Sequence, residues 1–483
     1  MTNDVIKQSP DNLSSPQSAD SLNVQKEYIL YTRRWLVLAI FVLYSASNAM
    51  QWIQYSVIED VVMDYYNIDS IWVNWTSMVF MVIYIPCIFP ASWLLDKYGL
   101  RNSALIGGIA TCLGCWLKVL SVPRDLFWVG FLGHSIIGFG QVFVLNLPAR
   151  LAAVWFGPEQ VSSACSIGVF GNQLGVAAGF LLPPILVKNS EDKEDVGNQL
   201  QIMFYTMCIT IIYTFSVFKS APPTPPSAAQ DNIEVSIGDN FFHSIKRLGK
   251  SRNYMLLLVT YGMNVGIFYA ISTLLNQVVL GNFPGANEDI GRIGLVLVLA
   301  GLFGSLICGF ILDKTHRFKE TTLALYAASA IGMVIYTFTL GAGHIWVVYL
   351  GAFILGFFMT GYLPVGFEYA AEITYPEPEG TVTGLMNASV FGIIFTIVSG
   401  FFLDWWGDVW SNVAMCVVLV TGTILTACIK SNLLRQAASK SSLDLLLHTS
   451  NAGPLSYITQ PRHLSPTRPS QVILLPSKYM TQI

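Results

Sequence analysis

Runs of about twenty apolar residues alternate with short polar segments from residue 35 to residue 429. An α-helix of about 20 residues crosses the hydrocarbon core of a membrane. The pattern therefore predicts twelve membrane-spanning helices, six in each half of the chain. Their expected ranges are 35–57, 75–95, 103–121, 126–148, 163–187, 199–218, 254–280, 293–312, 321–341, 345–367, 381–402 and 409–429.

The polar turn after the second predicted span is repeated after the eighth. The first turn reads SWLLDKYGLR around Asp96, and the second reads GFILDKTHR around Asp313, 217 residues later. Pro148 and Pro364 keep nearly the same spacing, 216 residues. We infer that the chain is a tandem duplication of a six-helix unit.

The composition supports a membrane protein, because 53% of the residues are hydrophobic and only 11% are charged, which is far too apolar for a soluble domain. With the first span running outward, the cytoplasmic loops hold eleven Lys and Arg residues and the opposite loops hold five. Basic residues near short loops stay in the cytosol, so both termini are expected there. The five on the outer side are Lys118, Arg124, Lys188, Lys193 and Arg292.

Polar segments divide the chain into five expected parts. Residues 1–30, which are rich in Ser, Asp and Asn, are expected to form a disordered cytosolic tail and not a cleaved signal peptide. A polar, proline-rich cytosolic linker at 220–252 separates two six-helix bundles at 31–219 and 253–435. Residues 436–483 are expected to form a flexible cytosolic tail.

The charge and the cysteine and histidine residues argue against several function classes. A net charge of −3 gives no basic surface for nucleic acid. The eight cysteines fall within apolar spans, where packing is expected in place of disulfide or metal chemistry. Of six histidines, only His134 lies within a predicted span, and it has no acidic or cysteine neighbour at ligand spacing. We therefore expect no enzymatic activity, no metal and no cofactor.

Charged residues gather at the cytoplasmic ends of the predicted spans. Arg150 follows the fourth span, and Glu368 occupies the matching place in the tenth. With the two repeated turns, they predict ion pairs that hold the halves together in one state and release them in another. The predicted cytoplasmic gate consists of Asp96, Arg101, Arg150, Asp313, Arg317 and Glu368.

Twelve spans in two parallel halves, with a basic turn after the second and the eighth, resemble the major facilitator superfamily over about residues 30–435. The resemblance implies an all-α membrane protein in which two six-helix bundles rock around a central site. It also implies that the first, fourth, seventh and tenth spans line the cavity.

The lining spans carry aromatic and polar side chains without formal charge at mid-membrane. These are Tyr44, Asn48, Trp52 and Tyr55 on one face of the first span, Gln141 and Asn146 in the fourth, and Tyr269, Ser272, Thr273 and Asn276 in the seventh. Trp and Tyr rings attract an ammonium group, by about 2 kcal/mol or more per ring when water is excluded. Interhelical packing and anchoring at the membrane interface are the plainer alternative.

Six strings in both halves resemble the feline leukaemia virus subgroup C receptor-related transporters, a family associated with choline and ethanolamine transport and earlier assigned haem export. The strings are NAMQWIQYS from residue 48, WFGPE from 155, GNQLG from 171, FYAISTLLNQ from 268, GRIG from 291 and FMTGYLP from 358. The resemblance implies that Trp52 and Tyr269 face the ammonium, that Gln141 is a polar cavity residue and that Met81 is a wall residue. Asn48 and Asn276 complete the predicted substrate site.

The chain departs from the family in the eleventh span. After Ser389 the family usually continues with Ala-Gln, whereas this chain reads Val-Phe-Gly, is two residues shorter and lacks the cavity glutamine. Two missing residues turn the following helix by about 200°. Either the helix is locally unwound, or the contact to the polar end of the substrate differs.

The cavity and the resemblance together predict a transporter of choline, ethanolamine or both. Haem transport is an alternative, although haem iron requires an axial ligand and His134 is the only candidate in a span; a receptor-like member that does not transport is another. Because no carboxylate lies among the central spans, we expect facilitative uniport. We expect a monomer in the lipid bilayer of the plasma membrane, with a mitochondrial or endoplasmic reticulum membrane as the alternative.

Overall fold

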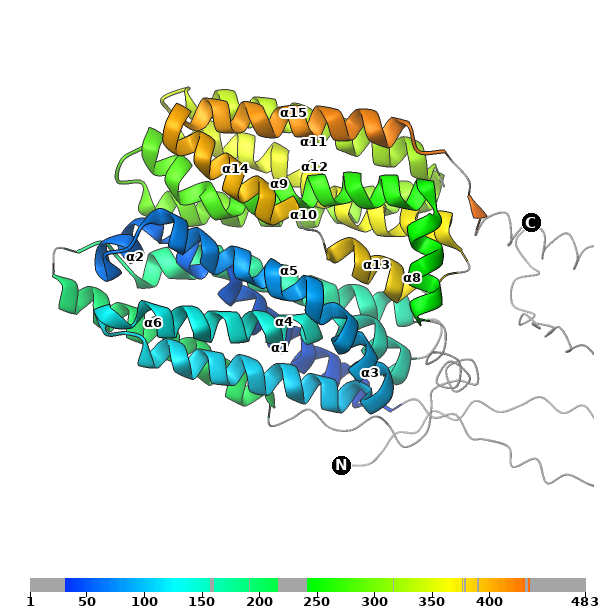
Figure 1. Cartoon of the computed structure of the whole chain (residues 1–483), viewed down its shortest axis with the longest axis horizontal. Helices are drawn as coiled ribbons and strands as arrows, with labels where there is room; N and C mark the ends of the chain where they lie inside the picture. The colour runs from blue at the N-terminus through cyan, green and yellow to red at the C-terminus, as the bar shows by residue number, and fades with distance from the viewer. Residues whose placement is uncertain are drawn as a thin grey trace, which may run out of the picture. The chain divides into compact units, whose positions relative to one another are not determined.

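In the computed structural model, the regular secondary structure of the described part of the chain consists of helices (Figure 1). That part comprises residues 31–156, 160–190, 192–215, 241–315, 317–375, 377, 379–388, 391–430 and 433–434. The predicted tails at 1–30 and 436–483 lie outside it.

The first half of the chain forms five long helices and two short ones. They are α1 (Arg34–Val57), α2 (Glu59–Tyr66), α3 (Ser70–Leu120), the 3-10 turn η1 (Arg124–Leu126), α4 (Phe127–Trp155), α5 (Val161–Leu186) and α6 (Lys193–Phe215). The helix α3 contains two predicted spans, which meet at Gly99 with φ 79°. A glycine adopts this left-handed conformation without steric cost, so the basic turn seen in the sequence reverses the chain there.

The second half repeats this arrangement. Its helices are α8 (Phe241–Lys250), α9 (Arg252–Asn282), α10 (Asn287–Thr315), α11 (Phe318–Leu340), α12 (Ile345–Thr374), α13 (Glu379–Asn387), α14 (Phe391–Trp406) and α15 (Asp408–Ala427). The helix α8 falls inside the range predicted as a linker. The eleventh predicted span corresponds to two helices, α13 and α14, and residues 389 and 390 between them lie outside the described part.

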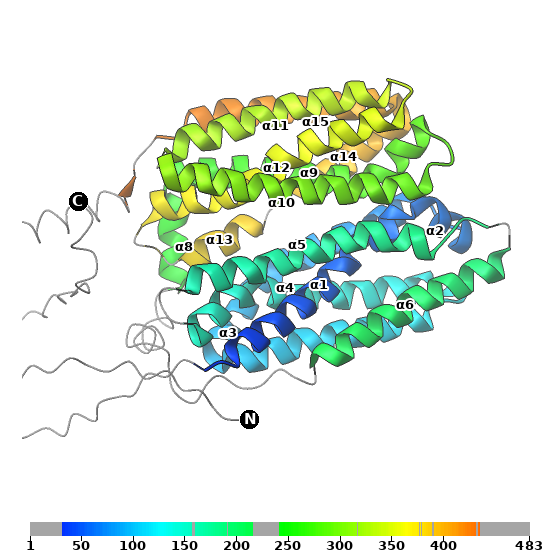
Figure 2. The same ribbon diagram turned by 180° about the vertical axis from the view of Figure 1, so that it is seen from behind.

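Figures 1 and 2 show the two halves as two groups of helices lying side by side. The groups meet where α1 packs against α9, α5 against α10, and α3 against α14. At the α5–α10 contact, a Cβ atom added to Gly294 would lie 2.1 Å from the ring of Phe180. The two halves therefore approach closely there because one helix presents a glycine.

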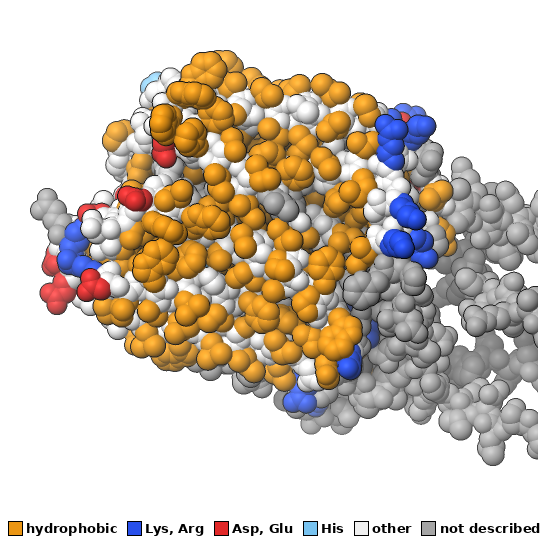
Figure 3. Space-filling model, viewed as in Figure 1, with side chains coloured by type: hydrophobic (Ala, Val, Ile, Leu, Met, Phe, Trp, Pro, Cys, Tyr) orange, Lys and Arg blue, Asp and Glu red, His pale blue; other side chains and the backbone are white. Residues whose placement is uncertain are grey.

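Eleven helices in the described part are long and apolar enough to cross a membrane. The sixth predicted span, 199–218, falls on α6, which runs up to the undescribed residues 216–240. Figure 3 shows apolar side chains over the long face of the molecule and charged ones at its two ends. Phe338 and Trp405, for example, are 77% and 71% exposed. Large exposed apolar side chains at this density are typical of a surface that faces lipid.

The charges at the two ends of the molecule differ in sign. Acidic side chains predominate at the end that carries α2, and Lys and Arg gather at the end that carries α8 (Figure 3). The side of the membrane that each end faces stays a prediction. One assignment was wrong: Lys118 does not lie in an outer loop but is 1% exposed. Its position in the last turn of α3 lets the long side chain fold back into the bundle.

Candidate functional site

The structure brings together Trp52 of α1 and Tyr269 of α9, from opposite halves of the chain. Their ring centroids are 5.1 Å apart and their planes cross at 70°, an edge-to-face contact. The indole N–H of Trp52 donates to the carbonyl oxygen of Ser77 at 3.3 Å, which fixes the orientation of the ring. The two rings touch one another directly, so the structure shows this aromatic pair in a closed arrangement.

Met81 completes one wall of this pair through a glycine. A Cβ atom placed on Gly392, in the first turn of α14, would lie 2.6 Å from the sulfur of Met81 and 2.9 Å from the ring of Tyr269. A side chain at this position would require Met81 or Tyr269 to shift. Gly392 was not among the predicted site residues, although it is the glycine of the Val-Phe-Gly string that follows Ser389.

A hydrogen bond joins the two halves one helical turn from the aromatic pair. The hydroxyl oxygens of Ser77 in α3 and Thr273 in α9 are 2.8 Å apart, and both side chains are buried. Ser77 precedes Met81 by four residues, and Thr273 follows Tyr269 by four. These hydroxyls therefore lie on the same helical faces as the two wall residues.

The predicted amide residues do not all face this pair. Asn48 donates its amide to the hydroxyl of Thr111 at 3.0 Å and to the carbonyl of Ile137 at 3.4 Å, inside the N-terminal bundle. Gln141 is half-buried on α4. Asn276 donates to the carbonyl of Val57 at 2.8 Å, at the α2 end of the molecule. A role for these three in binding the substrate stays a prediction.

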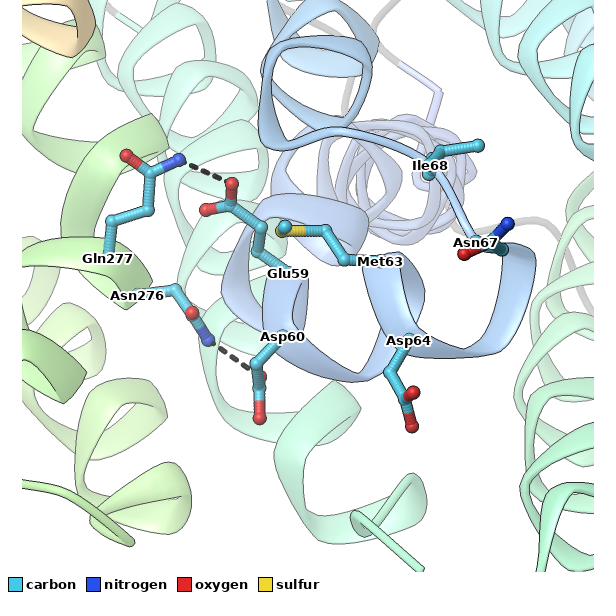
Figure 4. Close-up of a pocket in the computed structure, with 8 residues that line it drawn as sticks. All are labelled: Glu59, Asp60, Met63, Asp64, Asn67, Ile68, Asn276 and Gln277. Atoms are coloured by element: carbon cyan, nitrogen blue, oxygen red, sulfur yellow. Dashed lines mark hydrogen bonds between the residues drawn. The ribbon is translucent and has the colours of Figure 1, made fainter. Parts of the chain in front are cut away.

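A cross-bundle cluster at the α2 end, which we term the α2 closure, consists of Glu59 and Asp60 of α2 with Asn276 and Gln277 of α9. Asn276 donates to a carboxylate oxygen of Asp60 at 3.1 Å, and Gln277 donates to Glu59. Figure 4 shows these residues at a pocket of about 540 Å³. Of the four residues, only Asn276 was predicted as a site residue.

A second group missed by the sequence surrounds the buried Lys118. Its ammonium nitrogen is 3.3 Å from Nδ1 of His134, 3.4 Å from the amide oxygen of Gln51, and 4.9 Å from the ring centroid of Tyr55. His134 thus packs as a hydrogen-bonded residue of the bundle interior, directly behind the α1 segment that carries Trp52.

The predicted cytoplasmic gate lies at the α8 end. Arg101, Arg317 and Glu368 are exposed there, and Arg150 is half-buried. The side chains of the other two predicted members, Asp96 and Asp313, lie outside the described part of the structure. The function of these six residues as a gate stays a prediction.

An unpredicted ion pair lies at the same end. Arg247 of α8 donates to both carboxylate oxygens of Glu377, at 2.5 and 3.0 Å. The hydrogen bonds from Arg247 lower the pKa of Glu377 below its ordinary value. This bidentate pair ties α8, at the start of the second half, to the segment between α12 and α13.

Comparison with known proteins identifies a family and solved structures that the chain resembles. A family model, "Major Facilitator Superfamily", matches residues 37–397. Among solved structures, a bacterial homologue of the human lysosomal transporter Spinster, in an inward-facing and occupied conformation, superposes with a TM-score of 0.64 at 13% identity, covering 82% of this chain and 96% of that one. The fucose:proton symporter of E. coli gives a TM-score of 0.58 at 15% identity, covering 83% of this chain and 98% of that one.

Curated relatives are far closer in sequence. The choline/ethanolamine transporter flvcr2a of Danio rerio is 51% identical over 421 residues, which cover 86% of this chain and 90% of that protein. The choline/ethanolamine transporter FLVCR2 of Homo sapiens is 47% identical, with coverage of 89% and 82%. The choline/ethanolamine transporter FLVCR1 of Felis catus is 49% identical, with coverage of 84% and 74%.

Proposed function

The chain belongs to the feline leukaemia virus subgroup C receptor-related family of the major facilitator superfamily, and from this membership we propose that it carries choline, ethanolamine or both. The protein is a multi-pass membrane transporter and not an enzyme. The observation that carries the substrate proposal is the contact of Trp52 and Tyr269 across the two halves.

The aromatic pair suits an ammonium group. Two electron-rich rings from opposite bundles can hold a cation between them, with about 2 kcal/mol or more per ring in a dry site. In the closed arrangement the rings contact each other, so the substrate enters only when the bundles move apart. The hydroxyls of Ser77 and Thr273, one turn away, then become free to bind the polar end of the substrate.

We propose facilitative uniport by alternating access. A proton- or sodium-driven carrier usually places a carboxylate among its central spans, and in the described part of the spans the Trp52–Tyr269 pair is bordered by Ser77, Thr273 and Met81. A monovalent cation is then drawn inward by the membrane potential, with about 2.3 kcal/mol per 100 mV. We place the α2 closure on the outer side of the membrane and both termini in the cytosol. We expect the protein to be a monomer in the plasma membrane.

Haem is less well supported as the substrate. Its iron requires an axial ligand, and Nδ1 of His134 is occupied by the ammonium group of Lys118 in the bundle interior. A small ammonium substrate needs neither a metal ligand nor a pocket large enough for haem.

Uptake of radiolabelled choline and ethanolamine in cells tests the proposal. We expect saturable uptake that Trp52→Ala and Tyr269→Ala each abolish at equal surface level. Trp405→Ala and Phe338→Ala, which remove exposed aromatic rings on the apolar surface, serve as matched controls and are expected to retain uptake. Uptake that survives both site substitutions would reject the aromatic site, and no uptake by the intact chain at the cell surface would favour a receptor-like role.

A further inference from the structure

Glu59 is a carboxyl group buried at the contact between the two halves. It is 1% exposed and begins α2, directly after the last residues of α1. Gln277 of α9 donates to one of its oxygens, whereas the other oxygen, Oε2, is buried without a hydrogen-bond partner in the described part of the chain. Figure 4 shows the carboxyl group facing Gln277 at the pocket of the α2 closure. A buried carboxyl oxygen without a donor favours the protonated acid.

The negative charges around Glu59 also favour its protonated form. Asp60 of α2 and Asp404 of α14 are the acidic groups whose negative charge it senses. Asp64, one turn further along α2, forms an ion pair with Lys193 of α6. Burial, with a smaller contribution from the two acidic neighbours, raises the pKa of Glu59 to about 8.

Several of the other charged groups at this end pair with one another, and Arg124 lies over the ring of Tyr65 of α2, 5.7 Å from its centroid. Glu288 of α10 bonds Lys188 and Arg292, at 3.4 and 2.9 Å, and Asp289 bonds Arg292 at 3.5 Å. Among the ion pairs of the described residues, these cations and Lys193 are bound to carboxylates other than Glu59. The polar groups that approach Glu59 from α9 and α3 are Gln277 and Ser70, which carry no charge.

We infer that Glu59 binds a proton each time the α2 closure forms and releases it when the closure opens. Opening separates Gln277 from Glu59 and admits water to the pocket, so the carboxyl regains its ordinary acidity. Since the pKa of the group is higher in the closed state, closure is favoured at low pH, and this advantage is lost as the pH rises toward about 8. One proton per closure corresponds to as much as a tenfold change in the closed-to-open ratio per pH unit.

We place the entry and exit of the proton on the same side of the membrane, because Glu59 lines a pocket at the α2 end and Trp52 and Tyr269 lie about two helical turns further into the bundles along α1 and α9. For the transporter proposed above, this site therefore changes the rate of the cycle without coupling it to a proton gradient. Outer pH regulates how fast the substrate moves, while the substrate's own gradient and the membrane potential determine how far it accumulates.

A conformational measurement tests the site without relying on transport. Spin labels carried by non-canonical amino acids at Glu194 and His344, two exposed positions at the α2 end of opposite halves, report the distance between the bundles in lipid nanodiscs without substrate. We expect the short-distance population to grow as the pH falls from 8.5 to 5.5. Glu59→Gln should make the population independent of pH, whereas Asp125→Asn, which removes an exposed carboxyl at the same end, should keep the dependence.

Two outcomes overturn the inference: an equal pH dependence in Glu59→Gln, or no dependence in the unmodified chain. Glu59→Asp, which keeps a carboxyl, guards against a folding defect in the glutamine variant and should retain a pH dependence. In uptake assays the initial rate should depend on outer pH, and the final accumulation should not follow an imposed pH gradient. Absence of uptake with a preserved distance response would reject the proposed transport and leave the proton site intact.

Discussion

The hydroxyl groups of Ser77 and Thr273 form a hydrogen bond of 2.8 Å between two helices that belong to opposite halves of the chain. Every opening of the central site must break this bond, because it lies one turn from the contact of Trp52 with Tyr269. A bond that exists in one state and not in the other shifts the balance between them by its net free energy, about 1 kcal/mol.

We predict that Ser77→Ala and Thr273→Ala each lower the closed-to-open ratio about fivefold, and that the double substitution adds little, because the two side chains share one interaction. The spin-label distance at the α2 end measures the ratio. Ser47→Ala is the control, since its hydroxyl bonds the carbonyl of Leu43 within its own helix. Additive effects of the two site substitutions would show that the hydroxyls act independently.

Gly392 offers a test of the wall between Met81 and Tyr269. Gly392→Ala places a Cβ atom within 2.6 Å of the sulfur of Met81, so one of the neighbours must move. We predict that half-saturation of uptake requires at least about tenfold more substrate, equivalent to about 1.4 kcal/mol. The concentration dependence of initial uptake measures this change.

The control for that experiment is Gly281→Ala in α9, where an added Cβ meets nothing within 4 Å. Shortening the partner, in Gly392→Ala with Met81→Ala, should recover part of the lost affinity by making room for the new methyl group. If the single Gly392→Ala substitution left uptake unchanged, Gly392 would be a packing position and not part of the site.

The sequence predicted the helices well because crossing a membrane requires a long apolar run, which hydropathy detects directly. The turn at Gly99 was visible for a similar reason, since its basic motif occurs twice. The eleventh span is the informative difference, because hydropathy predicted one span where the structure has the two helices α13 and α14.

The site was predicted less completely, because periodicity shows which residues share a helical face but not which other helix that face contacts. Asn48, Trp52 and Tyr55 were predicted on one face of the first span, yet Trp52 contacts the opposite half while Asn48 and Tyr55 pack into their own bundle. The pairing of Trp52 with Tyr269 came from family resemblance. The burial of Glu59 could not be foreseen, because it depends on where α9 lies in space.

The ion pair of Arg247 and Glu377 predicts how firmly α8 is held. Glu377 has a lowered pKa in the folded protein, so the pair stabilises the docking of α8 above the ordinary glutamate pKa of 4.5 and is lost as the pH falls below that value. In the unmodified chain, acid should therefore loosen α8 and speed the exchange of its amide hydrogens. Glu377→Gln should give the same faster exchange already at neutral pH. Hydrogen exchange of the α8 amides measures it, and reversing both charges should restore protection.

Lys118 gives the prediction with the largest expected effect on stability. Its ammonium group donates toward His134 and Gln51 in a region closed to water. Lys118→Ala therefore removes the donor to Nδ1 of His134, leaves the amide oxygen of Gln51 with only the weak thiol donor of Cys115, and opens a cavity. Each unpaired acceptor costs about 1–3 kcal/mol. We expect a lowered thermal unfolding temperature in detergent and reduced surface level, whereas Lys250→Ala, at an exposed position in α8, should change neither. Lys118→Met separates the two causes: it refills the volume, so a protein as stable as the unmodified chain would assign the loss to the cavity, and a protein that stays unstable would assign it to the missing donor.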